Sequence, residues 1–406
     1  MTQPRPEMAE VVRSCYDAFL ERYGAGLTPE QRRALDDLIR CRTAALGGHV
    51  LECQQCGHQQ VSYNSCRNRH CPKCLATASA RWLERQAADL LPVPYFHVVF
   101  TLPNVLDPIA LPNPRVVYGL LLRTAADTLL EVAANRHNLG AQLGVLTVLH
   151  TWGQALQLHP HVHCVVPGGG LSPDGTRWIG CPGNFLLHFK VLSQVFRGKF
   201  LAGLREAFAR GQLRFPGELA EFNSADAFER LLSQSARTEW VVNIKPPFAN
   251  PERVLKYLAR YTHRVAISNS RLLELKDGHV TFRYKDYAQG GICKLMKLSA
   301  IEFVRRFLMH VLPSGFVRIR HYGFLANRHR IEKLALCRKL LADAQPPESG
   351  TAGATEEPKQ AQEVTPAKVC PVCGARTMIV IAEFPPGAMA LEILKASVFD
   401  SVFDTS

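Results

Sequence analysis

The chain has 406 residues, of which 47% are hydrophobic, and its 48 Lys and Arg against 35 Asp and Glu leave a formal net charge of +13. This composition excludes a disordered chain, and the length is sufficient for two or three domains. Because no long apolar run and no secretory leader are seen, we expect a cytoplasmic, nucleoid-associated protein with no membrane partner. The basic excess predicts DNA or RNA as a partner, with a merely basic soluble protein as the alternative.

We expect the first domain to span residues 1–92. Apolar residues recur every third or fourth position over residues 7–40, which predicts helices. Thr28-Pro29 followed by Gln31 is typical of a helix start. Residues 41–74 then hold six cysteines and three histidines with few apolar residues, and therefore predict a core organised by metal.

The cysteine spacing predicts structural zinc. Two Cys-x-x-Cys pairs separated by 14 residues resemble a four-cysteine zinc site, and a chain without an export signal favours zinc over disulfides. The other metal-binding residues between and before these pairs allow a second zinc, in which alternate pairs share a metal. His49 or His58 as a surface residue is the alternative, so we expect one or two zinc ions. The candidate ligands are Cys53, Cys56, Cys71, Cys74, Cys41, Cys66, His49 and His70.

Residues 93–290 predict a second domain of class α+β. Strand-like segments lie at 95–102 and 239–244, and residues 271–285 form a hairpin pattern with a turn at Asp277-Gly278. Amphipathic helices are expected at 114–135, 190–211 and 251–262. Strands and helices without strict alternation favour an antiparallel sheet flanked by helices.

The remaining chain predicts three parts. Residues 291–342 are basic and are expected to be helical, residues 343–368 have the composition of a flexible linker, and residues 369–406 form a tail. The tail contains Cys370-x-x-Cys373, which is half of a metal site. Cys337 or a second subunit could complete it, or the pair could be free of metal; a homodimer therefore stays open.

The segment "LHPHVHCVVP" (158–167) places histidines at alternating positions of an apolar run. In a strand these residues share one face, so His159, His161 and His163 would lie side by side. Imidazoles arranged in this way can hold one divalent cation and leave positions open for a substrate oxygen. The alternative is a set of core histidines that bond only to each other.

The segment "NPERVLKYLARYTHR" (250–264) predicts a helix with Tyr257 and Tyr261 on one face. Tyrosine ionises near pH 10, so a nucleophilic role needs a metal on the target phosphate and cations beside the hydroxyl. The alternative is that both tyrosines are helix packing. The neighbouring cations, and two more in the cysteine-rich region, are candidates for DNA binding: Arg253, Lys256, Arg260, Arg264, Arg67 and Arg69.

The histidine strand followed by the tyrosine helix resembles the HUH endonuclease superfamily, and the chain most resembles the two-tyrosine rolling-circle transposases of bacterial insertion sequences. "YNSCRNRHCPKC" is similar to the family's zinc-binding domain, "FHVVFTLP" to its first strand motif and "HPHVHCVVPGGG" to its metal motif. "KPPFANPERVLKYLARYTHR" is similar to its tyrosine helix and "RHYGFLANRHR" to the basic close of the domain.

The resemblance implies an HUH-type sheet and a tyrosine that attacks single-stranded DNA, leaving a 5′-phosphotyrosine link. It implies that His161 and His163 hold Mg²⁺ or Mn²⁺, with His159, His263 or Asn269 as the third ligand. The first alternative is an initiator of rolling-circle plasmid replication, which uses the same chemistry. The second is a non-catalytic zinc-finger regulator that binds duplex DNA.

Overall fold

The structure is a computed structural model that describes residues 5–74, 82, 86–248, 253–254, 266–344 and 369–388. The chain divides into two compact units, which are taken separately below. Unit 1 contains residues 1–75 together with 348–406, and unit 2 contains residues 76–347.

Unit 1 begins with two helices that pack against each other, α1 (Met8–Tyr23) and α2 (Pro29–Arg40). The predicted start of the second helix is confirmed: the Thr28 hydroxyl accepts a bond from the Gln31 N–H, and the Gln31 side chain accepts one from the Thr28 N–H. Short 3-10 turns, η1 (Gly24–Gly26) and η2 (Ala44–Leu46), follow the two helices.

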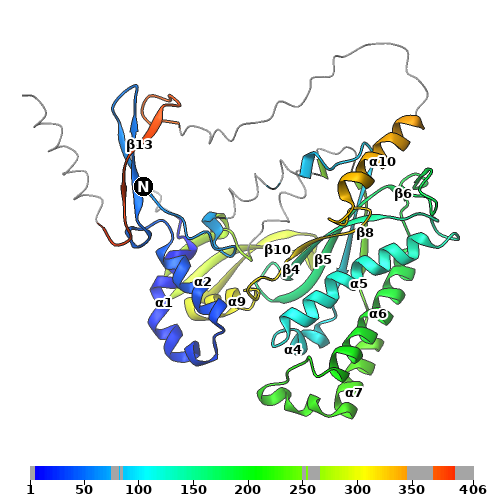
Figure 1. Ribbon diagram of the computed structural model, residues 1–406. Helices are drawn as coiled ribbons and strands as arrows, with labels where there is room; N and C mark the ends of the chain where they lie inside the picture. Colours follow the sequence, from blue (N-terminus) through cyan, green and yellow to red (C-terminus); the bar gives the residue numbers. More distant parts are fainter. Residues whose placement is uncertain are drawn as a thin grey trace, which may run out of the picture. The chain divides into compact units, whose positions relative to one another are not determined.

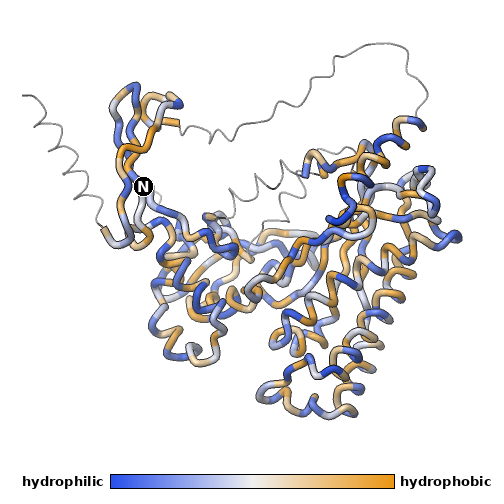
Figure 2. The backbone as a smooth tube through the Cα atoms, viewed as in Figure 1, coloured by the Kyte–Doolittle hydropathy of each residue, from blue (hydrophilic) through white to orange (hydrophobic). Residues whose placement is uncertain are grey.

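Unit 1 also contains a three-stranded antiparallel sheet in the order β13-β1-β2. Its strands are β1 (Gly48–Cys53), β2 (Gln59–Tyr63) and β13 (Met378–Phe384). We expected residues 369–406 to be a tail distinct from the first domain, whereas β13 pairs with β1 along its length. Figure 2 shows β13 as a largely hydrophobic strand, in keeping with its sequence MIVIAEF.

Unit 2 is built on a five-stranded sheet in the order β12-β4-β5-β3-β8 (Figure 1), in which every neighbouring pair is antiparallel. Helices α5 (Pro114–Ala134) and α6 (Phe189–Ala209) cover one face, and their buried side chains share a hydrophobic core with that face. The opposite face carries the histidines. The strands are β3 (Tyr95–Thr101), β4 (Gly144–Trp152), β5 (Leu158–Pro167), β8 (Val242–Phe248) and β12 (Ile319–Gly323).

Smaller elements extend this framework. A second sheet, in the order β11-β10-β9, has α9 (Ala300–Leu308) in contact with β10 and β11. The chain between and after these elements forms η3 (Asn104–Leu106), α4 (Asp107–Ala110), β6 (Gly169–Leu171), β7 (Trp178–Gly180), η4 (Gly217–Asn223), α7 (Ala225–Arg237), η5 (Asn269–Arg271), β9 (Leu272–Lys276), β10 (His279–Asp286), η6 (Tyr287–Gln289), β11 (Ile292–Ser299) and α10 (Arg330–Asp343).

The expected α+β class with antiparallel sheets and flanking helices is confirmed. The hairpin at 271–285 is confirmed as β9 and β10, and its turn residues Asp277 and Gly278 both have positive φ, 50° and 69°. The expectation of a separate, mainly helical region at 291–342 is wrong. Residues 292–299 form β11, and β12 pairs with β4 as the edge of the central sheet, so a boundary at 290 would divide that sheet.

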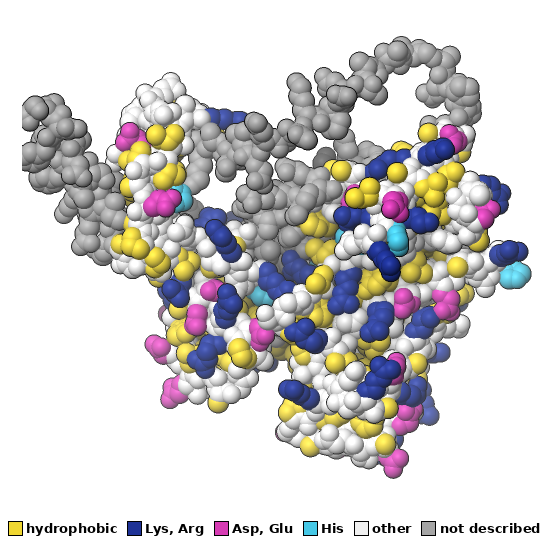
Figure 3. Space-filling model, in the orientation of Figure 1, with side chains coloured by type: hydrophobic (Ala, Val, Ile, Leu, Met, Phe, Trp, Pro, Cys, Tyr) yellow, Lys and Arg dark blue, Asp and Glu magenta, His cyan; other side chains and the backbone are white. Residues whose placement is uncertain are grey.

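Within the described residues, no helix combines the length and the apolarity that crossing a membrane would need. On the face seen in Figure 3, Lys and Arg side chains are spread over the surface of unit 2, with Asp and Glu between them. The net positive charge is therefore not confined to a single patch on this face.

Candidate functional site

Three imidazoles from adjacent strands meet on the open face of the central sheet. The strand register sets His161 of β5 opposite His150 of β4, and His163 follows two residues later on the same face. One ring nitrogen from each of His150, His161 and His163 lies within 4.8 Å of the other two. This group, the histidine trio, has the composition of a site for a divalent cation.

The spacing of the trio fits metal binding. His163 Nε2 lies 3.0 Å from His150 Nδ1, and its other ring nitrogen lies 2.8 Å from Nε2 of His97 on β3. Neighbouring donors around an octahedral ion are also about 3 Å apart when each metal–ligand bond is about 2.1 Å. His161 Nδ1 donates to the His159 carbonyl over 2.7 Å, which leaves its Nε2 as the lone-pair nitrogen.

Burial keeps the imidazoles of His97, His161 and His163 neutral near pH 7, because it lowers their pKa values. Burial lowers the pKa of His161 to about 4 and that of His97 to about 3, and burial together with His150 lowers the pKa of His163 well below its usual value. Exposed Lys245, which faces His97 across the β3–β8 pair, contributes to the low pKa of His97. A neutral ring keeps the lone pair that a metal needs, while Lys245 supplies a positive charge suited to a phosphate.

The expected third ligand, His159, is replaced in this geometry by His150. His159 lies on β5 with its ring centre 5.0 Å from that of His161, but it is outside the group of three nitrogens. His150 comes instead from the neighbouring strand, where Trp152 stacks on it at 4.6 Å. Of the other two candidates, Asn269 lies in η5, and His263 is outside the described residues.

Tyr257 and Tyr261 also lie outside the described residues, as do Lys256, Arg260 and Arg264. Two residues of the predicted tyrosine helix are described, and both are helical: exposed Arg253 and fully buried Val254. Val254 clusters with Tyr95, Leu146 and Val165. Because Val165 follows His163 by two residues in β5, Val254 packs on the sheet face that carries the trio.

The structure places the N-terminal cysteines in two groups, and the pairing differs from both expected schemes. Cys41, Cys66, Cys71 and Cys74 form one group, with Sγ–Sγ distances of 3.6 Å for Cys41–Cys71, Cys41–Cys74 and Cys66–Cys74. A zinc ion bound tetrahedrally by four thiolates separates its sulfurs by about 3.8 Å.

Cys53 and Cys56 belong to the second group, with Cys370 and Cys373. A single site that joins Cys53 and Cys56 to Cys71 and Cys74 is therefore wrong, because each pair lies with other cysteines. Neither group includes His49, a β1 residue, or His70. Cys337 does not complete the Cys370–Cys373 pair either, because Cys53 and Cys56 complete it.

The loop between Cys66 and Cys71 presents one of the two expected DNA-contacting arginines. Arg67 is exposed with a φ of 53°, whereas Arg69 is partly buried and its pKa is lowered by burial. Asn68 anchors the loop to α2 by donating to Asp37 over 2.9 Å and accepting from the His70 N–H over 2.8 Å. The loop therefore has a fixed conformation from which Arg67 projects.

Sequence reasoning missed His150, His97 and Lys245. His97 and Lys245 lie on strands distant in sequence from β5, so only the pairing of β3 with β5 and β8 brings them near the trio. His150 lies on β4, the strand directly before β5, so its place in the trio depends on the pairing of two consecutive strands. One sequence signal could have identified His150: it lies in the apolar run "GVLTVLHTW", directly before the segment with alternating histidines.

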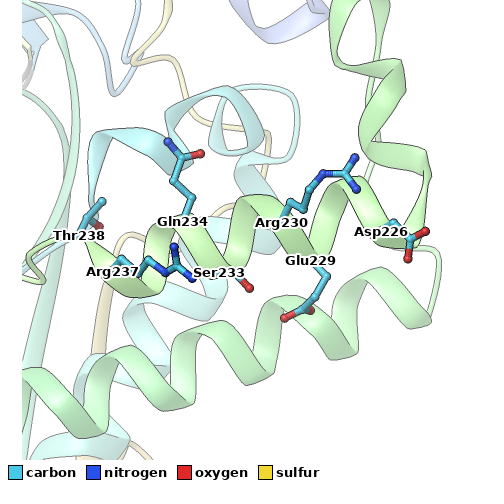
Figure 4. A pocket seen from close by; sticks show the side chains of 7 residues that line it. All are labelled: Asp226, Glu229, Arg230, Ser233, Gln234, Arg237 and Thr238. Atoms are coloured by element: carbon cyan, nitrogen blue, oxygen red, sulfur yellow. The ribbon is translucent and has the colours of Figure 1, made fainter.

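A surface hollow elsewhere in unit 2 has no set of metal-binding side chains like the histidine trio. Figure 4 shows it along α7, with side chains of both charges and no histidine or cysteine. One of its carboxylates, Glu229, is paired with Arg205 at 2.6 Å. The histidine trio therefore stays the candidate catalytic site.

Comparisons with known proteins support a zinc-binding N-terminal domain. Residues 144–333 match the family model described as "Putative transposase", and residues 11–102 match the model described as "Transposase zinc-binding domain". No solved structure gives a significant match.

Two curated proteins are similar over nearly the whole chain. "Putative transposase y4qJ" of Sinorhizobium fredii is 51% identical, over 95% of this chain and 97% of that protein. "Transposase for insertion sequence element IS801" of Pseudomonas savastanoi pv. phaseolicola is 30% identical, over 93% of this chain and 90% of that protein. These matches favour a transposase over the replication initiator and the regulator. The chain belongs to the IS91/IS801 family of insertion-sequence transposases, with a zinc-binding domain and with DNA as its partner.

Proposed function

We propose that this transposase cuts and rejoins single-stranded DNA through 5′-phosphotyrosine intermediates, with Tyr257 and Tyr261 as the nucleophiles. The observation that carries the proposal is the histidine trio, three clustered imidazoles on the sheet face against which Val254 packs. The reaction is the rolling-circle transfer of one DNA strand from the ends of an insertion sequence to a target.

His150, His161 and His163 would hold the catalytic cation, Mg²⁺ or Mn²⁺. When bound, such an ion neutralises the charge of the scissile phosphate and orients it for in-line attack. Imidazole nitrogens suit transition-metal ions better than Mg²⁺, so we expect higher activity with Mn²⁺. Lys245 adds a fixed positive charge next to His97, at the side of the trio where a DNA backbone phosphate would lie.

The tyrosines fit this site by helical spacing. Tyr257 and Tyr261 follow Val254 by three and seven residues. Those spacings return to one side of a helix, so a helix continued from Val254 would direct both hydroxyls to the sheet face with the trio.

The covalent steps balance without an external energy source. The phenolate oxygen of one tyrosine attacks the phosphorus, an O–P bond forms, and the bond to the 3′ oxygen breaks, which leaves a free 3′-OH. A tyrosine cuts the target strand in the same way, which frees a target 3′-OH. In the transfer step this 3′-OH attacks the phosphotyrosine at the element end, a P–O bond to the 3′ oxygen forms, and the bond to the tyrosine oxygen breaks and releases the phenol. Two tyrosines allow one to hold the first cleaved strand while the second cuts the other end.

The test uses single-stranded DNA that carries the sequences flanking the gene, incubated with protein and Mn²⁺. We expect a protein–DNA adduct that survives denaturation and that is lost in the double variant Tyr257→Phe/Tyr261→Phe. Tyr287→Phe is the matched control, because Tyr287 is 69% exposed in η6. An adduct that persists in the double variant, or that forms equally without metal, would contradict the proposal.

A further inference from the structure

The C-terminal Cys-x-x-Cys pair lies beside the first Cys-x-x-Cys pair of the N-terminal domain, so that four sulfurs come together. Cys53 Sγ lies 3.6 Å from Cys373 Sγ, Cys56 Sγ lies 3.6 Å from Cys370 Sγ, and all four lie within 4.8 Å of one another. These distances are far longer than a disulfide bond of about 2.05 Å, and all four cysteines are free. They are close to the sulfur separation of about 3.8 Å in a four-thiolate zinc site.

The two Cys-x-x-Cys turns have the same backbone geometry. In each, the N–H four residues after the first cysteine donates to that cysteine's carbonyl: Gly57 to Cys53 over 2.8 Å, and Gly374 to Cys370 over 3.0 Å. In each, the first cysteine's N–H donates to the carbonyl five residues later, His58 or Ala375. This shared geometry is independent of the sulfur distances.

A left-handed glycine closes both turns. Gly57 and Gly374 have φ values of 69° and 74°, a conformation that residues with a side chain rarely adopt. The repeated Cys-x-x-Cys-Gly sequence at 53–57 and 370–374 is therefore required by the turn. Two matched turns that present four sulfurs to one point are the arrangement of a zinc ribbon.

The strands around these turns join the two segments. The Gln54 N–H donates to the Thr377 carbonyl over 3.1 Å, and β13 pairs with β1 from Cys53–Met378 to Gly48–Phe384. Leu51 and Met378 are buried beside Cys53 and Cys370. This small cluster is too limited to hold β13 in place by burial alone, which points to a metal cross-link.

We propose that Cys53, Cys56, Cys370 and Cys373 bind a second structural zinc ion, which fastens the C-terminal segment into the zinc-binding domain. The matched zinc-binding family model covers residues 11–102 and so does not include this segment. The domain is consequently discontinuous, and unit 2 is an insertion between its two parts. Loss of the last 40 or so residues would then disable the N-terminal domain.

The first test counts zinc by mass spectrometry in purified full-length protein that carries His161→Gln and His163→Gln, so that the histidine trio adds no metal to the count. We expect two zinc ions per chain in this background and one when Cys370→Ser/Cys373→Ser is added. Cys181→Ser/Cys293→Ser is the matched control and keeps two, because neither residue belongs to a cysteine group. One zinc in the background protein, or two after Cys370→Ser/Cys373→Ser is added, would overturn the proposal.

The second test does not depend on how well that variant folds. A protease site is inserted between residues 350 and 360 of the full chain, with an affinity tag at the C-terminus. After cleavage, we expect the tagged fragment to retain the rest of the chain and to release it on addition of a zinc chelator. With Cys56→Ser in the same background, the fragment should dissociate with zinc present. A fragment that separates in zinc-containing buffer, or that stays bound in the chelator, would overturn the proposal.

Discussion

Unit 2 and unit 1 reach a defined structure by different means. In unit 2 the core between the sheet and helices α5 and α6 contains 39 buried residues, among them Phe100, Phe196 and Phe200. In unit 1, helices α1 and α2 bury apolar residues of their own, among them Val11, Phe19 and Leu35. The clusters around β1 contain only four and two buried residues, and two of these are Cys53 and Cys370. Unit 1 also holds two groups of four cysteines. The comparison shows that one chain can use metal for two purposes. Around the sheet of unit 1, where few apolar residues are buried, the cysteine groups stabilise the structure, whereas the histidines of unit 2 lie on a sheet whose hydrophobic core does not include them.

Removal of zinc gives the largest difference between the units. We expect an excess of a strong chelator to unfold the sheet of unit 1, because a structural zinc contributes about 10–16 kcal/mol to the folding of a small domain. The unfolding transition of unit 2 should keep its midpoint. Differential scanning calorimetry of the full chain, with and without chelator, measures both. A thermogram that does not change on addition of the chelator would contradict the claim that zinc stabilises unit 1.

Truncation of a core phenylalanine should destabilise unit 2 and leave unit 1 unchanged. Phe196 is fully buried, with its ring centre 4.9 Å from that of Phe100 and 5.3 Å from that of Trp240. Phe196→Ala should lower the free energy of unfolding of unit 2 by about 3–5 kcal/mol and leave the zinc content unchanged. Phe185→Ala, at a half-exposed position, is the control and should cost far less. Equal losses for the two variants in denaturant titrations would contradict this assignment of the core.

Acid should weaken unit 2 through a histidine outside the trio. Burial lowers the pKa of His310 to about 4, and its ring bonds Thr151 at 3.2 Å and the Leu156 carbonyl at 3.1 Å. Between about pH 6.5 and pH 4 the unfolded chain binds a proton that the folded chain does not. Stability therefore falls as the pH falls through this range, by about 3 kcal/mol from this residue.

The variant His310→Gln isolates that contribution. At pH 7 the natural protein should be the more stable, and its advantage over the variant should shrink as the pH is lowered to 4, measured by urea denaturation. A difference between the two proteins that stays constant with pH would show that His310 is not responsible.

A surface ion pair gives the smallest expected effect. Arg205 and Glu229 are paired at 2.6 Å between α6 and α7, and both side chains are 49% exposed. Solvent screens such pairs, so Arg205→Ala should change the stability of unit 2 by less than about 1 kcal/mol. A loss of unfolding free energy as large as that of Phe196→Ala would contradict the conclusion that the hydrophobic core, rather than surface charge, stabilises unit 2.

Local sequence patterns predicted those elements whose structure depends on residues close together in the sequence. The helix start at Thr28, the turn at Asp277-Gly278 and the alternation of His159, His161 and His163 each depend on residues within a few positions of one another. The α+β class followed from the order of such segments. The short edge strand β12 was missed, because its five residues, IRHYG, carry no strand periodicity.

Pairings across the chain could not be predicted in this way. His97 reaches His163 across 66 positions of sequence, and Cys53 reaches Cys373 across 320 positions. The type and spacing of residues indicate which metal they can bind. Which residues bind the same metal ion depends on the tertiary structure, and for that reason the expected ligand sets of the catalytic site and of the zinc sites were incomplete.

The histidine trio is tested most directly by the Mn²⁺ dependence of adduct formation on single-stranded DNA in His150→Gln and His159→Gln. Both residues are histidines beside His161, but the structure groups His150 and not His159 with His163. We predict that His159→Gln keeps the Mn²⁺ requirement of the natural protein, whereas His150→Gln needs at least about tenfold more Mn²⁺ or forms no adduct. A His150→Gln variant with an unchanged Mn²⁺ requirement, together with a His159→Gln variant that has lost activity, would contradict the account.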